Sequence, residues 1–106
     1  SLHDALPIYT APSAADFNSS VISSILVSED SGNADTITVT LTSGTTVFSL
    51  FKVKAVGANT TVELLTNDLV LQSAEILKVT AATANRLHVV ASIQEFAIHR
   101  TPQSAL

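Results

Sequence analysis

Cysteine, methionine and tryptophan are all absent from this sequence of 106 residues, and Tyr9 is its single tyrosine. Without cysteine the chain has no disulfide, no thiolate ligand for zinc and no cysteine nucleophile. No apolar run approaches the ~20 residues of a membrane-spanning helix, and no charged and then apolar signal peptide is visible. We therefore expect a chain that folds without covalent cross-links and does not cross a membrane.

Charge is scarce, and positive charge most of all. Charged residues make up 13% of the sequence, whereas a typical soluble domain has about 25%. Lysine and arginine number only five, and the formal net charge is -4. Binding that neutralises several phosphates needs a basic cluster, so we expect no nucleic-acid partner. The low charge, together with 46% hydrophobic residues, indicates that part of the surface is covered in an assembly.

Valine, isoleucine, leucine and threonine are abundant instead, and β-branched residues pack well on a pleated surface. The clearest segment is 36–42, where Ile37, Val39 and Leu41 alternate with four threonines. A period of two predicts a strand with the three apolar side chains inward and the threonines outward.

Further strand-like runs are separated by polar turns that recur about every 8–12 residues. They cover residues 21–28, 46–56, 60–65, 69–71, 76–81 and 87–93. The alternation is mixed around Phe48 to Phe51, which predicts a β-bulge there. A helix over 73–84 is the alternative, but its apolar positions are spread around the helix. We predict an all-β fold, a single antiparallel β-sandwich that is jelly-roll-like, with about 7–8 strands.

The length suits one domain, and we divide the chain into three parts. Residues 1–20 are expected to form an extended leader, residues 21–96 the β-sandwich domain, and residues 97–106 a C-terminal tail. Residues 1–8 resemble translated sequencing-adapter read-through, which would make them an artefact at the end of an environmental gene fragment.

Catalytic machinery is not evident in the sequence. No serine lies in a G-x-S-x-G turn, and the three glycines stand alone in separate turns and form no phosphate loop. His88 lies in a strand pattern on the face opposite the core, and no partner for a catalytic triad is near it in sequence. We expect no catalytic residue, no cofactor-binding residue and no enzyme.

Acidic residues cluster once, at Glu29, Asp30 and Asp35. Loop carboxylates can ligate calcium, which takes six to eight oxygen ligands. The spacing does not match an EF-hand, and a solvated turn is the competing interpretation. We therefore expect no metal site, with these three residues as the only calcium candidates.

Three segments carry a resemblance to a known class of proteins: VGANTTVEL at 56–64, LVLQSAEILKV at 69–79 and AATANRLHVVAS at 81–92. They are similar to motifs of small virion structural proteins of tailed phages, "V-x-A-N-T-T", "L-V-L-x-x-x-D-x-L-x-V" and "A-x-x-A-N-x-L/V-x-V". The resemblance covers about residues 21–96. It departs at Gly57, where such chains often have proline, and at Ala74-Glu75, where they often have Gly-Asp.

The resemblance implies a β-sandwich that decorates or stabilises the capsid, or attaches at the neck or tail, and therefore a location in the virion. It implies capsid or tail proteins as partners and a homo-oligomer, with a trimer favoured, and it transfers no catalytic residue. The alternative is a secreted carbohydrate-binding or adhesin-type β-sandwich, which would be expected to present aromatic platforms or a calcium loop. A small enzyme is a third possibility.

Overall fold

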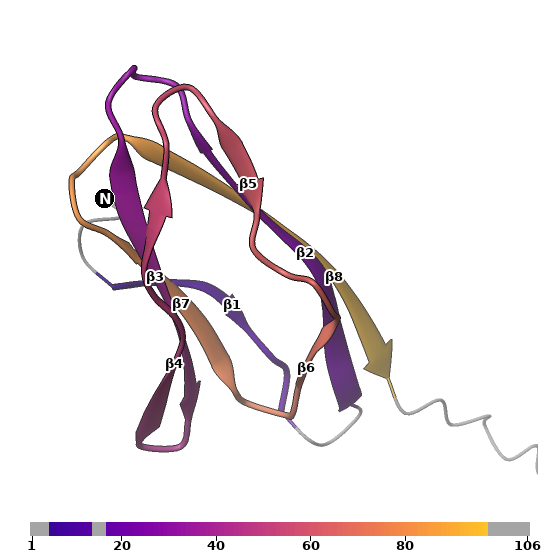
Figure 1. Ribbon diagram of the computed structural model, residues 1–106. Coiled ribbons are helices and arrows are strands. Elements are labelled where there is room, and N and C mark those ends of the chain that lie inside the picture. Colours follow the sequence, from indigo (N-terminus) through magenta and orange to yellow (C-terminus); the bar gives the residue numbers. More distant parts are fainter. Residues whose placement is uncertain (1–4, 14–16, 98–106) are drawn as a thin grey trace, which may run out of the picture.

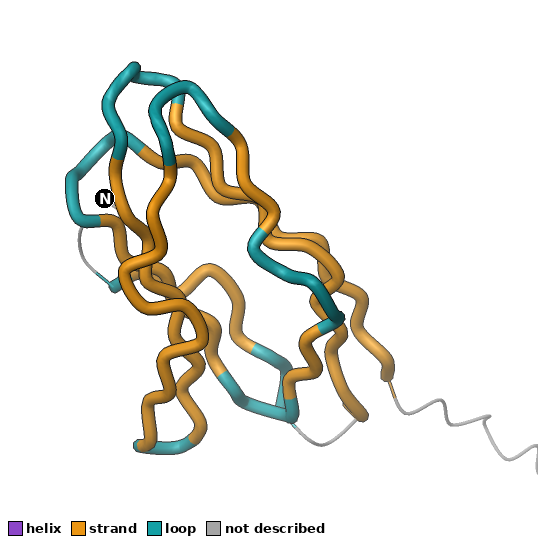
Figure 2. Tube along the Cα trace, in the orientation of Figure 1, coloured by secondary structure: helices purple, strands orange, loops and turns teal. Residues whose placement is uncertain are grey.

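A computed structural model describes residues 5–13 and 17–97 of the chain (Figure 1). These residues form eight strands and no helix (Figure 2). The strands are β1 Leu6–Thr10, β2 Phe17–Glu29, β3 Asp35–Ser43, β4 Thr46–Val56, β5 Thr61–Glu63, β6 Leu69–Leu71, β7 Ile76–Ala81 and β8 Leu87–Ala97. The prediction of an all-β chain with about seven to eight strands is confirmed, and β7 replaces the alternative of a helix over 73–84.

The strands make two antiparallel sheets that form a β-sandwich. The first sheet has the order β1-β7-β3-β4. The second is built around β2, with β8 along one edge and the short strands β5 and β6 along the other. Leu26 shows this arrangement, because it is the register partner of Glu63 on β5 and of Val90 on β8. The jelly-roll detail of the prediction is not confirmed by this strand order.

The core lies between the two sheets and is almost entirely aliphatic. Its buried side chains from the long strands are Ile22, Ile25, Val27, Ile37, Val39, Leu77 and Val79, each 0% exposed. Burying one such side chain stabilises the fold by about 1.5–3 kcal/mol relative to leaving it in water. The predicted inward face of 36–42 is confirmed at Ile37 and Val39. The prediction is wrong near the turn that joins β3 to β4, where Leu41 is only half-buried and Thr42, predicted to face outward, is buried.

Strand β4 is irregular where the sequence pattern is mixed. The register with β3 shifts between Val39↔Phe51 and Thr40↔Ser49, so β4 has an extra residue there, and the predicted bulge is confirmed. A second shift precedes it, and Val53 within it has a φ of 53°. Left-handed backbone is unusual for a β-branched residue.

The residues that the structure describes within the first twenty are part of the sandwich and do not form a leader outside it. Residues 6–10 form β1, which pairs with β7, and the following Ala11 is 2% exposed. β2 starts at Phe17, and so the predicted domain boundary at residue 21 lies too late. At the other end β8 continues to Ala97, and the rest of the predicted tail lies outside the described residues.

Candidate interaction surface

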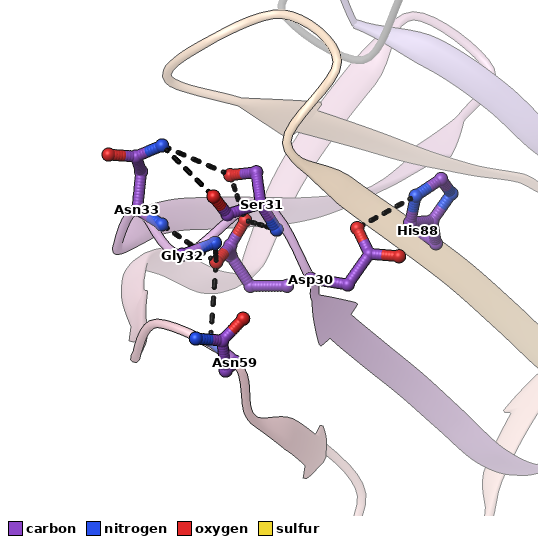
Figure 3. Close-up of polar contacts among 7 residues, drawn as sticks. Asp30, Ser31, Gly32, Asn33, Asn59 and His88 are labelled. Atoms are coloured by element: carbon purple, nitrogen blue, oxygen red, sulfur yellow. Dashed lines mark hydrogen bonds and ion pairs between the residues drawn. The ribbon is translucent and has the colours of Figure 1, made fainter.

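Ser31, Gly32, Asn33 and Asn59 lie around the end of β2 (Figure 3). Their hydrogen-bond donors enclose the carboxylate of Glu29. One oxygen accepts the amide of Ser31 at 2.8 Å and its hydroxyl as well. The other accepts the amides of Gly32 and Asn33 at 3.0 Å and that of Asn59 at 3.2 Å. The side chain is 1% exposed. Glu29 therefore closes its own loop and ties that loop to the turn between β4 and β5.

These donors keep the carboxylate ionised. The hydrogen bond from the Ser31 side chain, supported by backbone amides of Ser31, Asn33 and Asn59, lowers the pKa of Glu29 to about 2. Burial acts in the opposite direction and disfavours the charge. A buried carboxylate with this many donors is satisfied without a cation.

The other two calcium candidates point to partners of their own. Asp30 lies 3.5 Å from the Nε2 atom of His88, and both side chains are well exposed. Asp35 is 8% exposed and accepts the amide of Thr83 at 3.1 Å. Among the described residues no group of three or more metal-ligating side chains gathers. The structure therefore does not bring Glu29, Asp30 and Asp35 together into a calcium site.

Glu63 and Glu75, like Glu29, accept hydrogen bonds from backbone amides. Glu63 accepts the amides of Ile25 at 2.8 Å and Leu65 at 3.1 Å, and the hydroxyl of Ser24. The bond from Ser24 is the main reason that the pKa of Glu63 is lowered. Glu75 accepts the amide of Gln72 at 2.6 Å. Because these carboxylates bind the chain's own backbone, their role is structural.

Tyr9 makes a polar link between the two sheets. Its hydroxyl donates to a carboxylate oxygen of Glu95 on β8 at 2.5 Å, so Ser20 on β2 donates to Tyr9, also at 2.5 Å. Burial first, and then the hydrogen bond to Glu95, raise the pKa of Tyr9. Through these two hydrogen bonds Tyr9 holds β1 against the second sheet.

The hollows formed by the described residues include two at the borders of the sandwich. The first, of about 430 Å³, lies between β4 and the connection from β5 to β6 and is lined by Leu50, Phe51, Lys54 and residues 64–69. The second, of about 400 Å³, lies where β3 begins and β4 ends and includes Asp35 and Arg86. Neither has a histidine or a paired nucleophile and base in its lining.

The sheet edges differ in how they are protected against pairing with another chain. β1 is short and contains Pro7, and β4 is bulged and carries Lys52 and Lys54. Proline, lysine and bulges are the usual guards of an edge strand. β8 has 11 residues, no proline and no lysine, and among the described residues it pairs only with β2. β8 is therefore the long edge with the fewest guards.

Within the part of the chain that the structure describes, large apolar side chains are exposed in two regions. They are Val47, Phe48 and Val53 on β4, and Leu26, Val70, Val90 and Phe96 on the second sheet, with exposed fractions of 38–62%. The sequence predicted a covered surface from low charge alone. The residues could not be found from the sequence, because their exposure depends on which strands are at the edges.

Comparisons with protein-family models, with curated proteins and with solved structures found no match. Among the described residues, no helix is present that could span a membrane.

Proposed function

We propose that this protein is a non-enzymatic structural protein of a tailed-phage virion. It decorates or stabilises the capsid, or attaches at the neck or tail, and it acts through self-association and docking. The observation that carries the proposal is the exposed apolar surface on β4 and on the second sheet, in a chain with only 13% charged residues. Exposed apolar surface in such a small domain is typical of a subunit that is covered in an assembly.

The motifs behind the resemblance have physical roles in this fold. Asn59 of the V-x-A-N-T-T segment has a φ of 54°, and Asn85 of the A-x-x-A-N segment has a φ of 63°. Asparagine adopts this left-handed backbone more easily than most residues. The amide of Asn59 also binds Glu29. The shared motifs therefore encode turns of this sandwich, which supports kinship with proteins built on the same turns.

The alternative function, a secreted carbohydrate-binding or adhesin-type module, has one observation in its favour. The 430 Å³ hollow combines Phe51 with polar side chains, including Lys54, Asn67 and Asp68. Tyr9, which could otherwise serve as a platform for a sugar, is bound to Glu95 and Ser20. We therefore place this function second.

Two measurements test the proposal. Light scattering of the full chain is expected to show a stable oligomer, and a strict monomer at high concentration would count against self-association. The genes next to this one are expected to encode capsid, portal or tail proteins. Neighbouring genes for secretion and sugar metabolism, together with binding on a glycan array that is lost in Phe51→Ala, would favour the alternative.

A further inference from the structure

The edge of β8 that faces away from β2 belongs to a regular stretch of the strand. From Leu87 to Ser92 its pairing with β2 has no register shift. Among the described residues no strand lies along its other edge. Every second backbone amide and carbonyl of an edge strand faces outward and can pair with another strand. This stretch is therefore a template on which one more strand can be added.

The side chains of β8 alternate between the two faces of the sheet. Leu87 is buried, and Val89, Ala91 and Ile93 are half-buried against the core. On the outer face Val90 is 62% exposed. The inner row is incompletely covered because β8 lies at the edge, and a neighbouring strand would cover it further.

Symmetry restricts how two copies can pair through this edge. A two-fold axis perpendicular to the sheet keeps inner residues opposite inner residues. The residue next to the axis lies opposite the same residue of the second copy, and this residue defines the register. With the axis at Val90, Leu87 lies opposite Ile93 of the second copy, and Val89 lies opposite Ala91 of the second copy. All four inner apolar side chains then face one another.

The neighbouring registers fit less well. An axis at Ala91 places Leu87 opposite Glu95, whose carboxylate is already engaged by Tyr9. An axis at Val89 places Ile93 opposite Asn85 in the turn before β8. Cross-strand apolar pairs stabilise a sheet, so both shifts lose contacts that the axis at Val90 provides.

The outer face agrees with the same register. Leu26 is the register partner of Val90 on β2 and is 38% exposed. With the axis at Val90, the row across the joined sheets reads Leu26, Val90, and then Val90 and Leu26 of the second copy. His88 lies opposite Ser92 of the second copy, so no like charges are placed opposite each other.

We propose that two copies of this chain pair through their β8 edges, antiparallel and with the two-fold axis at Val90, to form one continuous sheet. This inference rests on the self-association in the proposed function and names the contact that makes it. The contact is isologous, so it joins chains in twos. It does not by itself produce the trimer expected from the resemblance.

Cysteine cross-linking tests the register directly, because the chain contains no cysteine. Opposite residues of an antiparallel pair have Cα atoms about 4.5–5.5 Å apart, within the range of about 4.4–6.8 Å found for disulfides. Mild oxidation of Val90→Cys is expected to give a covalent dimer. Ser92→Cys alone should give little, whereas Ser92→Cys mixed with His88→Cys should give the mixed dimer. Val47→Cys, which is 59% exposed on β4, is the matched control and should remain monomeric on a non-reducing gel.

A charge placed on the axis tests the contact without oxidation. Val90→Lys puts two like charges opposite each other and is expected to raise the dissociation constant of the dimer by about tenfold or more. Mixing Val90→Lys with Val90→Glu should restore the dimer, and Val47→Lys should leave it unchanged. Because Val90 is exposed in the monomer, circular dichroism of each variant should retain the strand signal. Sedimentation should give a species of twice the 11.1 kDa chain for the unaltered protein.

The outcomes separate this inference from the proposed function. An oligomer that persists in Val90→Lys and does not cross-link at residue 90 overturns the β8 contact, while self-association and the proposed function stand. A chain that is monomeric at every concentration overturns the β8 contact and the self-association together. Cross-linking at Ser92 alone, without cross-linking at Val90, overturns the register.

Discussion

Strands β3 and β4 belong to one hairpin, yet they differ in regularity and in burial. β3 lies between β7 and β4, and its inner residues Ile37 and Val39 are 0% exposed. β4 is the outermost strand of the same sheet, and Val47 and Phe48 on it are 59% and 52% exposed. A two-residue period is therefore clear where both edges of a strand are paired and one face is covered. An edge strand is paired on one side only, so its apolar residues need not alternate strictly, and bulges can shift the period.

The largest effect that tests this contrast is expected from a charge in the centre of β3. Val39→Asp buries a carboxylate without a partner and should destabilise the domain by about 4 kcal/mol or more, which prevents folding of a marginal domain. Thr38→Asp, one residue away on the other face, should cost less than about 1 kcal/mol. Circular dichroism and urea unfolding measure both. Equal tolerance of the two substitutions would show that the assignment of faces is wrong.

The second effect concerns the open end of the β3–β4 hairpin. There Glu29 binds Asn59 in the turn that follows β4. The folded-state pKa of Glu29 is about 2, below its ordinary 4.5. Its contribution to stability is therefore complete above about pH 4.5 and is lost as the pH falls toward 2. The lowered pKa of Glu63 acts in the same direction.

Unfolding midpoints measured from pH 7 to pH 2 test this expectation. Glu29→Gln should be less stable at pH 7, because its amide group faces backbone donors, and its loss of stability in acid should be shallower. Asp30→Asn, at the exposed neighbouring position, should stay within about 0.5 kcal/mol of the unaltered chain at pH 7. An acid dependence that is identical with and without the Glu29 carboxyl would contradict the structural role given to it.

A third, smaller effect tests the bulged part of β4. Val53 has a φ of 53°, and left-handed backbone costs a residue with a Cβ about 1–2 kcal/mol. Glycine removes that cost but loses more freedom on folding. Val53→Gly should therefore stabilise the domain by up to about 1 kcal/mol. Val47→Gly, in the extended part of β4, should destabilise it, and thermal unfolding of the two variants should move in opposite directions.

The smallest effect is expected at Thr42 on β3. The hydroxyl of Thr42 is buried and has no hydrogen-bond partner in the part of the chain that the structure describes. Thr42→Val keeps the shape of the side chain and removes that polar group, so it should stabilise the domain by about 0.5 kcal/mol. Thr40→Val, at a half-buried position of the same strand, is the control and should change little. A clear loss of stability in Thr42→Val would mean that the hydroxyl is satisfied.

The strands between residues 35 and 81 could be predicted from the sequence, because their periods and turns are local signals. Ile37 and Val39 alternate with threonine, and Gly44 lies in the predicted turn with a φ of 60°. The bulge near Phe51 could also be predicted, since the apolar positions change parity there. These signals depend on neighbours in the chain, and the sequence contains them in full.

Pairings between distant segments could not be predicted. β1 was missed because Leu6–Thr10 contains proline and gains its strand only by pairing with β7. The same holds for Glu29, whose donors include Asn59, thirty positions away. An acidic turn looks the same in sequence whether its carboxylates face water, a cation or buried amides. Only the three-dimensional arrangement therefore reveals that the carboxylates of the three calcium candidates have separate partners.

The order of the strands has a consequence for how the chain acquires its structure. β1 pairs with β7, and β2 pairs with β8. Each of these two strands therefore pairs with a strand that lies much later in the sequence. Loops between such distant partners must be closed before their contacts are gained, which slows folding of sheet proteins to milliseconds or seconds. During synthesis on the ribosome, β2 emerges long before β8 and must remain unpaired along one edge until then. A holding chaperone, or rapid assembly after release, would protect the nascent chain during that interval.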